Sequence, residues 1–315
     1  MVRWLFHDPC LIGPRLDKAR VQWHSSAVDL AKLDKLRDQL RGYGSCLVAY
    51  SGGVDSVFLA HVAHQTLGDR ALAVIADSPS LPRRELAEAL DLGRRHGFPV
   101  RVVQTAEFNN PAYLENPTNR CYFCKHELFT ELAPLARSEG FAVIAYGENA
   151  SDVGDHRPGT QAAAEFQVRA PLKEAGLTKA DIRELSGHLG LPTADKPQMA
   201  CLSSRIPYGE AVTPEKLRMI EGAENTLRDL GFHDVRVRHH ELTHGHLARI
   251  EVGAGELSRF LADGLPVRIA DALKREGYTH VTLDLQGYRR GSLNEAVGVA
   301  VQFHRRRGQS PTLST

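Results

Sequence analysis

A six-residue loop, Ser51-Gly52-Gly53-Val54-Asp55-Ser56, constrains the fold of this chain more than any other segment. It follows an apolar run of strand length, residues 46–50, and precedes an apolar run with helical spacing. Two glycines let the backbone turn sharply and approach a phosphate closely, and the N–H groups at a helix N-terminus favour an anion. The loop lacks the lysine of a Walker A sequence. The pattern therefore predicts a phosphate-binding turn, which we favour over a tight turn without a ligand.

The residues around this loop predict the fold class. Strand-like runs alternate with helical ones, which is typical of an α/β protein with a doubly wound parallel sheet. Ligands of such sheets bind beyond the carboxyl ends of the strands. We expect strands over residues 46–50, 71–76, 100–104 and 141–146, and helices over residues 81–96 and 119–139.

The second half of the chain predicts a smaller α/β domain. Thr178 and Asp181 are spaced as an approximate capping box, and Thr213-Pro214 marks another helix start. Strand-like and helical runs follow, at residues 235–239, 246–252, 257–261, 267–275 and 281–285. We expect an arm (1–26), a phosphate-loop domain (27–200), a C-terminal substrate and sulfur-transfer domain (201–304) and a tail (305–315).

Charge and hydropathy narrow the classes of function. The net charge is +1, so no global field attracts nucleic acid, and an anion needs a local cluster of cations. The longest apolar runs are strand-sized and cannot span a membrane, and no secretory signal is visible. The sequence therefore predicts a cytoplasmic protein without a nucleic-acid partner.

Three of the five cysteines suggest chemistry. Cys121 and Cys124 are three residues apart, so on a helix both thiols share a face, and Cys201 lies in a second motif. Three thiolates could hold a [4Fe–4S] cluster or zinc. A redox dithiol and a purely structural pair are the alternatives, and spacing alone leaves all four open. Cys46 alternates within an apolar run and is expected in the core.

Charged residues in the second half form a candidate anion site. Arg236 and Arg238 alternate in a predicted strand, so both guanidiniums project from one face. Such a pair suits a phosphate or carboxylate. Glu224 lies on the preceding predicted helix, and Glu251 ends the following strand. The alternative for each is a solvated surface charge.

The loop resembles the PP-loop of ATP pyrophosphatases, which include NAD and GMP synthetases and several tRNA thiolases. Those enzymes cleave ATP between the α and β phosphates and transfer AMP to a substrate oxygen. From about residue 30 to 290, the chain is more specifically similar to the LarE family. These ATP-dependent sulfur transferases make the organic part of the nickel-pincer nucleotide cofactor. The resemblance rests on ordered segments, namely residues 51–56, 119–125, 155–159, 171–179, 200–209 and 236–251.

The resemblance implies an activity and a set of site residues. ATP with Mg²⁺ would adenylate a carboxylate of a pyridinium dicarboxylate mononucleotide, and sulfur would then displace AMP. The implied ATP-binding residues are Ser51, Gly52, Gly53, Asp55, Ser56, Asp152, Asp155 and Arg157. The implied substrate-binding residues are Arg236, Arg238, Glu224 and Glu251. The implied catalytic residues are Cys201, Ser204 and Arg205. Family members assemble as homo-oligomers, so the same is expected here.

The sulfur source divides the family that the chain resembles. Some members sacrifice one cysteine at the position of Cys201, whereas others resemble cluster-dependent tRNA thiolases. Because Cys121, Cys124 and Cys201 occur together, the resemblance favours a [4Fe–4S] cluster and a non-sacrificial mechanism. The alternatives are a tRNA thiolase, an ammonia-using adenylating synthetase and a nucleotide-sensing module without catalysis. The histidines at 239, 240, 244 and 246 have no assigned role.

Overall fold

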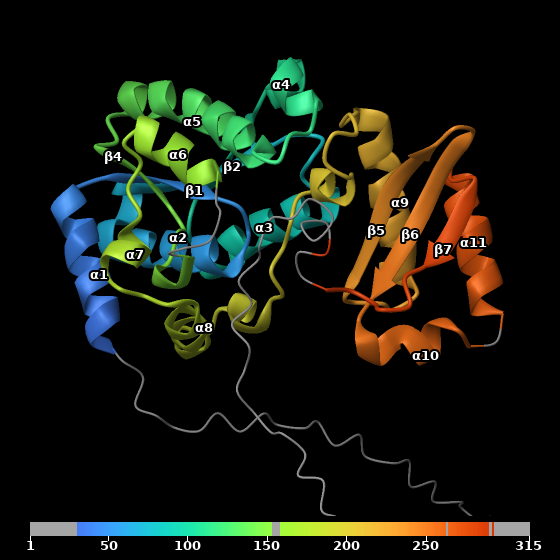
Figure 1. Cartoon of the computed structure of the whole chain (residues 1–315). Helices are drawn as coiled ribbons and strands as arrows, with labels where there is room; N and C mark the ends of the chain where they lie inside the picture. Colours follow the sequence, from blue (N-terminus) through green and yellow to red (C-terminus); the bar gives the residue numbers. More distant parts are fainter. Residues whose placement is uncertain (1–29, 153–157, 263, 290–291, 293–315) are drawn as a thin grey trace, which may run out of the picture.

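The computed structural model describes residues 30–152, 158–262, 264–289 and 292. The first half contains a four-stranded parallel sheet with the order β3-β2-β1-β4 (Figure 1). These strands are β1 (Cys46–Tyr50), β2 (Ala71–Asp77), β3 (Val100–Gln104) and β4 (Val143–Tyr146). Helices flank the sheet, which confirms the predicted α/β class.

Strand alternation explains why both faces of this sheet are covered. In β1, the side chains of Cys46, Val48 and Tyr50 enter one apolar core, whereas Leu47 enters the core on the opposite face. The first core is covered by α1 (Leu30–Tyr43), α2 (Val54–Leu67), α3 (Arg83–His96) and α8 (Lys179–His188). The second is covered by α5 (Arg120–Glu139) and α6 (Pro158–Glu165).

The strand order places the 51–56 loop at the switch point of the sheet. β2 and β3 extend the sheet on one side of β1, and β4 pairs with its other side. In open parallel sheets, the crevice beyond the carboxyl ends of strands at such a point receives the ligand. Since the 51–56 loop leaves the carboxyl end of β1, the topology agrees with its predicted role.

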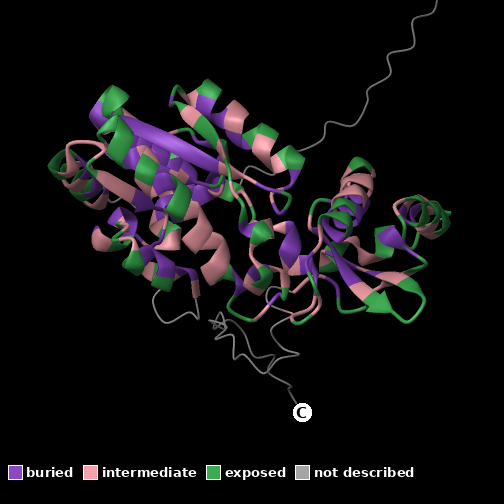
Figure 2. Ribbon diagram, turned by 90° about the horizontal axis from the view of Figure 1, so that it is seen from above, coloured by how far each residue is buried: buried purple, intermediate pink, exposed green. Residues whose placement is uncertain are grey.

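The second half contains a three-stranded sheet with the order β5-β6-β7. β5 (Val235–Leu242) and β6 (Gly245–Val252) are antiparallel, and β7 (His280–Leu283) runs parallel to β6. The helices α9 (Pro214–Asp229), α10 (Leu257–Phe260) and α11 (Leu265–Arg275) contribute to a separate buried core (Figures 1 and 2). None of the described helices combines the length and apolar character that a membrane span requires.

Short elements connect the two sheets. A small apolar cluster joins α4 (Pro111–Leu114), the 3-10 turn η5 (Leu202–Arg205) and the start of α9. The remaining short elements are η1 (Gly68–Arg70), η2 (Glu107–Asn109), η3 (Ala150–Asp152), α7 (Pro171–Glu174), η4 (Pro192–Asp195) and η6 (Ala254–Glu256). The expected domain boundary at residue 200 stays a prediction, and the expected arm and tail lie outside the described residues.

Candidate functional site

The 51–56 loop is closed by its own serines. The hydroxyls of Ser51 and Ser56 lie 3.1 Å apart, and Ser56 Oγ donates to the carbonyl of Gly53 at 3.1 Å. Helix α2 begins at Val54, and its N-cap, Gly53, has no side chain that could satisfy the first N–H groups. A helix start without a side-chain cap leaves donors for an anion. This geometry suits a phosphate.

Two glycines permit the close packing of this loop. Gly52 has φ +71°, and a Cβ atom there would lie 2.8 Å from the Cβ of Ala89 on α3. Gly147 follows β4, and a Cβ atom there would lie 3.0 Å from the backbone N of Ser56. Any side chain at either position would therefore push the loop away from its neighbours.

The carboxylate of Asp55 is balanced by a lysine that is distant in sequence. Lys179 Nζ lies 2.5 Å from Asp55 Oδ2, and Asn149 Nδ2 donates to Asp55 Oδ1 at 3.5 Å. Both partners come from beyond β4, on the side of the switch point opposite β2. A half-buried carboxylate at a phosphate loop also fits Mg²⁺, which is usually held by one or two carboxylates and the phosphates of the substrate.

The predicted ATP residues beyond the loop are placed only in part. Asp152, in η3, accepts a hydrogen bond from Asn149 Nδ2 at 3.0 Å and so lies beside the partner of Asp55. Asp155 and Arg157 lie outside the described residues. Nearby, Glu148 is buried and pairs with Lys173 Nζ at 2.8 Å. Burial alone would raise the pKa of Glu148, but hydrogen bonds from Lys173 and Tyr146 lower it overall.

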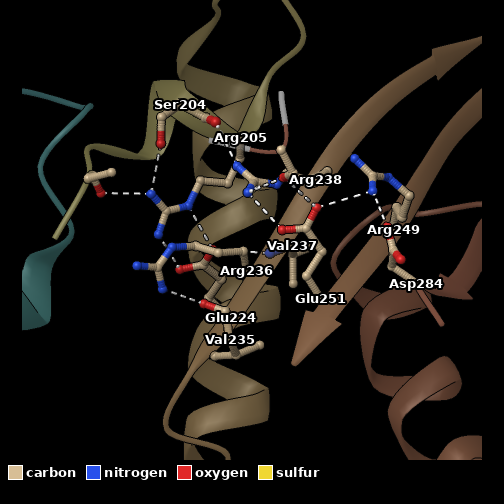
Figure 3. A network of polar contacts seen from close by, with 12 residues as sticks. Ser204, Arg205, Glu224, Val235, Arg236, Val237, Arg238, Arg249, Glu251 and Asp284 are labelled. Atoms are coloured by element: carbon tan, nitrogen blue, oxygen red, sulfur yellow. Dashed lines mark hydrogen bonds and ion pairs between the residues drawn. The ribbon is translucent and has the colours of Figure 1, made fainter. Parts of the chain in front are cut away.

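Glu224 is the centre of a buried cluster in the second half (Figure 3). Its carboxylate accepts both Arg205 Nε at 2.8 Å and Arg205 Nη2 at 3.0 Å, and it also accepts the backbone N–H of Val237 at 3.1 Å. Arg228 lies 3.2 Å away. Burial would raise the pKa of Glu224, but Arg205 outweighs it and the pKa lies below its usual value. Glu224 is therefore a charged anchor rather than a solvated surface residue.

A second cluster surrounds Glu251, which is also fully buried (Figure 3). Arg238 Nη2 lies 2.7 Å from Glu251 Oε2, and Arg249 Nη1 lies 3.1 Å from Oε1. Arg249 also pairs with Asp284. Arg238 reaches back to the carbonyl of Ser204 at 2.9 Å. This bond joins the second cluster to the turn η5.

The two clusters together carry an excess of positive charge. Among the described residues, the arginines are Arg205, Arg228, Arg236, Arg238 and Arg249, and the carboxylates are Glu224, Glu251 and Asp284. Arg236 donates to backbone carbonyls and lies over the ring of Tyr288. Burial and the neighbouring Arg205 lower the pKa of Arg236. Five guanidiniums against three carboxylates suit a dianion such as a phosphomonoester.

The three cysteines are neighbours but do not form a metal site. Among the described residues, no three His, Cys, Asp or Glu side chains are grouped so that they could hold a metal ion. Cys124 packs against an apolar cluster that includes Tyr113 and Leu202, whereas Cys121 is exposed. The predicted [4Fe–4S] or zinc site at Cys121, Cys124 and Cys201 is therefore not supported. Helical spacing gave the two thiols a common face, but apolar packing of Cys124 separates their environments.

The thiols nevertheless influence one another. Desolvation raises the pKa of both Cys121 and Cys124, and the neighbouring Cys201 raises each further. Arg120, which is buried, donates to the carbonyl of Ser203 at 3.0 Å and to the side chain of Asn116. The helix start at Arg120 thus contacts the turn that follows Cys201.

The histidines without an assigned role lie on the β5–β6 hairpin. The rings of His239 and His246 are 4.8 Å apart, and His239 is fully buried. Burial and the neighbouring His246 lower the pKa of His239 to about 4. His239 therefore stays neutral in the folded protein at neutral pH.

Sequence reasoning missed several residues that organise these sites. Lys179 ends the segment 171–179 but received no role, although a lysine directly after the N-cap Thr178 lies at a helix start near the expected ligand edge. Tyr113 and Asn116 come from a short segment without periodicity. Their contacts with residues 203–207 span about ninety residues, and no local pattern signals them.

Comparisons with known proteins agree with this arrangement. No family model matches the chain. It is 44% identical to an uncharacterized protein of Synechocystis sp. over 85% of the chain and 98% of that protein. It is 34% identical to the pyridinium-3,5-bisthiocarboxylic acid mononucleotide synthase of Lactiplantibacillus plantarum, over 79% of the chain and 89% of that protein. A glutamine-hydrolyzing GMP synthase polypeptide of Thermoplasma volcanium is 27% identical over 60% of the chain and 65% of that polypeptide.

Proposed function

The chain belongs to the LarE family of sulfur-inserting, adenylating enzymes, and from this premise we propose a specific reaction for it. The protein adenylates a carboxylate of a pyridinium dicarboxylate mononucleotide and converts it to a thiocarboxylate. The product would serve nickel-pincer cofactor synthesis. The name of the Lactiplantibacillus relative, a pyridinium bisthiocarboxylic acid mononucleotide synthase, supports this substrate class.

One observation carries the proposal: a single turn bearing Cys201 contacts both candidate anion sites. On one side, the N–H of Leu202 donates to the carbonyl of Ser80, just beyond the carboxyl end of β2. On the other, Arg205 binds Glu224, and Arg238 binds the carbonyl of Ser204. A thiol between an ATP loop and an arginine cluster is what sulfur transfer to an adenylated mononucleotide needs.

In the first step, the 51–56 loop binds the phosphates of ATP through backbone N–H groups and the hydroxyls of Ser51 and Ser56. A carboxylate oxygen of the substrate attacks the α-phosphorus, and pyrophosphate leaves. Mg²⁺, held by Asp55 with Asp152 nearby, would neutralise charge on the phosphates. Arg236 and Arg238 would bind the phosphate of the mononucleotide, and the Glu224 and Glu251 carboxylates hold the arginine side chains in place.

In the second step, the sulfur of Cys201 attacks the acyl carbon, and AMP leaves with the carboxylate oxygen. The thiol proton goes to solvent, and a thioester joins the substrate to Cys201. Loss of the Cα proton of Cys201 with cleavage of its Cβ–S bond then releases the thiocarboxylate and leaves dehydroalanine. Ser204 and Arg205 both bind the carbonyl of Cys201, at 2.7 and 3.0 Å, and so orient the nucleophile.

Single-turnover assays test this proposal. The anaerobically purified protein receives ATP, Mg²⁺ and either the pyridinium dicarboxylate mononucleotide or tRNA. We expect AMP and thiocarboxylate with the mononucleotide alone, and loss of the mass of H₂S from the peptide containing Cys201. Cys201→Ser should still release pyrophosphate but form no thiocarboxylate, whereas Cys121→Ser should retain both steps. AMP release that depends on tRNA would refute the substrate, and multiple turnovers with intact Cys201 would refute the sulfur source.

A further inference from the structure

Three hydroxyl groups form a closed, buried triangle between the two halves of the molecule. Tyr113 Oη lies 2.6 Å from Ser80 Oγ and 2.9 Å from Ser203 Oγ, and the two serine oxygens lie 2.7 Å apart. All three side chains are at most 4% exposed. Each hydroxyl has one donor hydrogen, so three bonds in a ring use each donor once. The ring therefore satisfies its own donors without water.

The triangle joins three segments that are far apart in sequence. Ser80 follows β2, whose pairing with β1 extends to Tyr50, the residue before the 51–56 loop. Tyr113 comes from α4, and Ser203 comes from η5, the turn whose N-cap is Cys201. A backbone bond from Leu202 N to Ser80 O, 2.9 Å long, runs beside the triangle. The carboxyl edge of the first sheet is thus tied to the Cys201 turn.

The rest of the turn is held from the second half. Arg205 Nη1 donates to the carbonyls of Ala200 and Cys201 at 2.7 and 3.0 Å, and its other nitrogens bind Glu224. Only the Ser80 and Tyr113 contacts and the bond from Arg120 to the carbonyl of Ser203 fix the turn relative to the first half through hydrogen bonds within the described residues. Loss of the Tyr113 hydroxyl would leave the turn folded but less well placed.

We propose that Tyr113 is a positioning residue for sulfur transfer, which sets the position of Cys201 relative to the ATP loop through Ser203 and Ser80. The inference rests on the proposed function, because it concerns the second of its two steps. Adenylation needs the 51–56 loop and the arginines, which the triangle does not touch. Transfer needs Cys201 at the acyl carbon, and a displacement of about 1 Å can cost about a hundredfold in rate.

The test compares Tyr113→Phe and Ser203→Ala with the full-length unaltered protein. Pyrophosphate release reports adenylation, and thiocarboxylate formation in a single turnover reports transfer. The rate at which iodoacetamide alkylates Cys201 reports the turn without any substrate. Tyr278→Phe, which removes another buried hydroxyl that lies beside His239, is the matched control.

We expect both triangle variants to release pyrophosphate at the normal rate and to form thiocarboxylate at least roughly tenfold more slowly. Their Cys201 alkylation rates should change, whereas those of Tyr278→Phe should not. An equal fall in both steps would indicate a merely structural role and overturn the inference, as would normal transfer. If the unaltered protein forms no thiocarboxylate at all, the proposed function fails, and the alkylation rates alone decide whether the triangle positions Cys201.

Discussion

At the scale of single residues, Lys179 explains how a phosphate loop tolerates Asp55. The loop itself contains no lysine, and its carboxylate would repel a triphosphate. The ammonium group of Lys179 contacts this carboxylate and is about one third exposed. When magnesium and ATP bind, the metal can take over Asp55 and release Lys179 towards the phosphates. We therefore regard Lys179 as the cation that a Walker A loop supplies from within its own sequence.

Removal of this charge gives the first prediction. Lys179→Met should raise the KM for ATP by roughly tenfold to a hundredfold, because a charge-assisted bond to phosphate contributes about 1.5–3 kcal/mol. Initial-rate assays of pyrophosphate release measure the change. Lys32→Met, which removes a lysine paired with Asp181 on the same helix, is the control and should leave the KM unaltered. Equal KM values for the two variants would contradict this role.

At the scale of elements, local patterns predicted most of the fold. The strands at residues 46–50 and 100–104 have the predicted bounds, and β2 extends one residue beyond the prediction. The Thr178 capping box and the helix start at Thr213 are confirmed, because caps are local interactions between neighbouring residues. The predicted strand at 141–146 begins only at Val143, and β5 extends to Leu242 through the hairpin.

Long-range contacts account for what the sequence did not predict. The helices α4, α6 and α7 are short and have no long apolar period, so nothing in their sequences marks them. The alternation of Arg236 and Arg238 predicted a shared face, but not that Glu224 and Glu251 would be fully buried beneath it. Burial depends on which elements pack together, and no spacing rule supplies that. The same limitation explains why a CxxC spacing suggested a metal site that the packing of Cys124 does not form.

The β5–β6 hairpin makes the stability of the protein sensitive to pH. His239 is buried, and its pKa falls from an ordinary value of 6.5 to about 4. Below pH 6.5 the unfolded chain binds a proton at this residue that the folded protein does not bind. Stability should therefore fall as the pH is lowered from about 6.5 to about 4, by up to about 1.4 kcal/mol per pH unit.

Urea unfolding at several pH values between 4 and 7.5 measures this dependence. His239→Gln should lose stability at neutral pH but show a flatter decline towards pH 4, because one titrating group is gone. His244→Gln alters an exposed histidine of the same hairpin and should keep the original slope. Identical slopes in all three proteins would contradict the assignment.

At the scale of the whole molecule, charge is concentrated rather than spread. The chain has a net charge of only +1, yet in the described part of the chain five arginines face three carboxylates within one buried network. Such a distribution favours a small dianion over a long polyanion such as RNA, which needs an extended basic surface. The same network holds the Cys201 turn, so substrate binding and sulfur transfer share one set of side chains.

Glu224 should therefore affect one half of the reaction more than the other. Glu224→Gln keeps the shape of the side chain but removes the charge that balances Arg205, Arg228 and Arg236. Because breaking a buried ion pair by removing one partner costs about 3–5 kcal/mol, we expect unfolding at a clearly lower urea concentration. ATP binding should persist, since the 51–56 loop and Lys179 belong to the other sheet, whereas thiocarboxylate formation should be lost.

Glu139→Gln provides the comparison, because Glu139 pairs with Arg101 at the surface and such pairs contribute about 0–1 kcal/mol. Calorimetric titration with ATP and urea unfolding, made on the same samples, separate binding from stability. If Glu224→Gln lost ATP binding as completely as sulfur transfer, the two sheets would depend on one another throughout. If it kept both, the arginine network would not hold the Cys201 turn. Retained ATP binding with lost transfer is the result that follows from a turn shared between two otherwise separate cores.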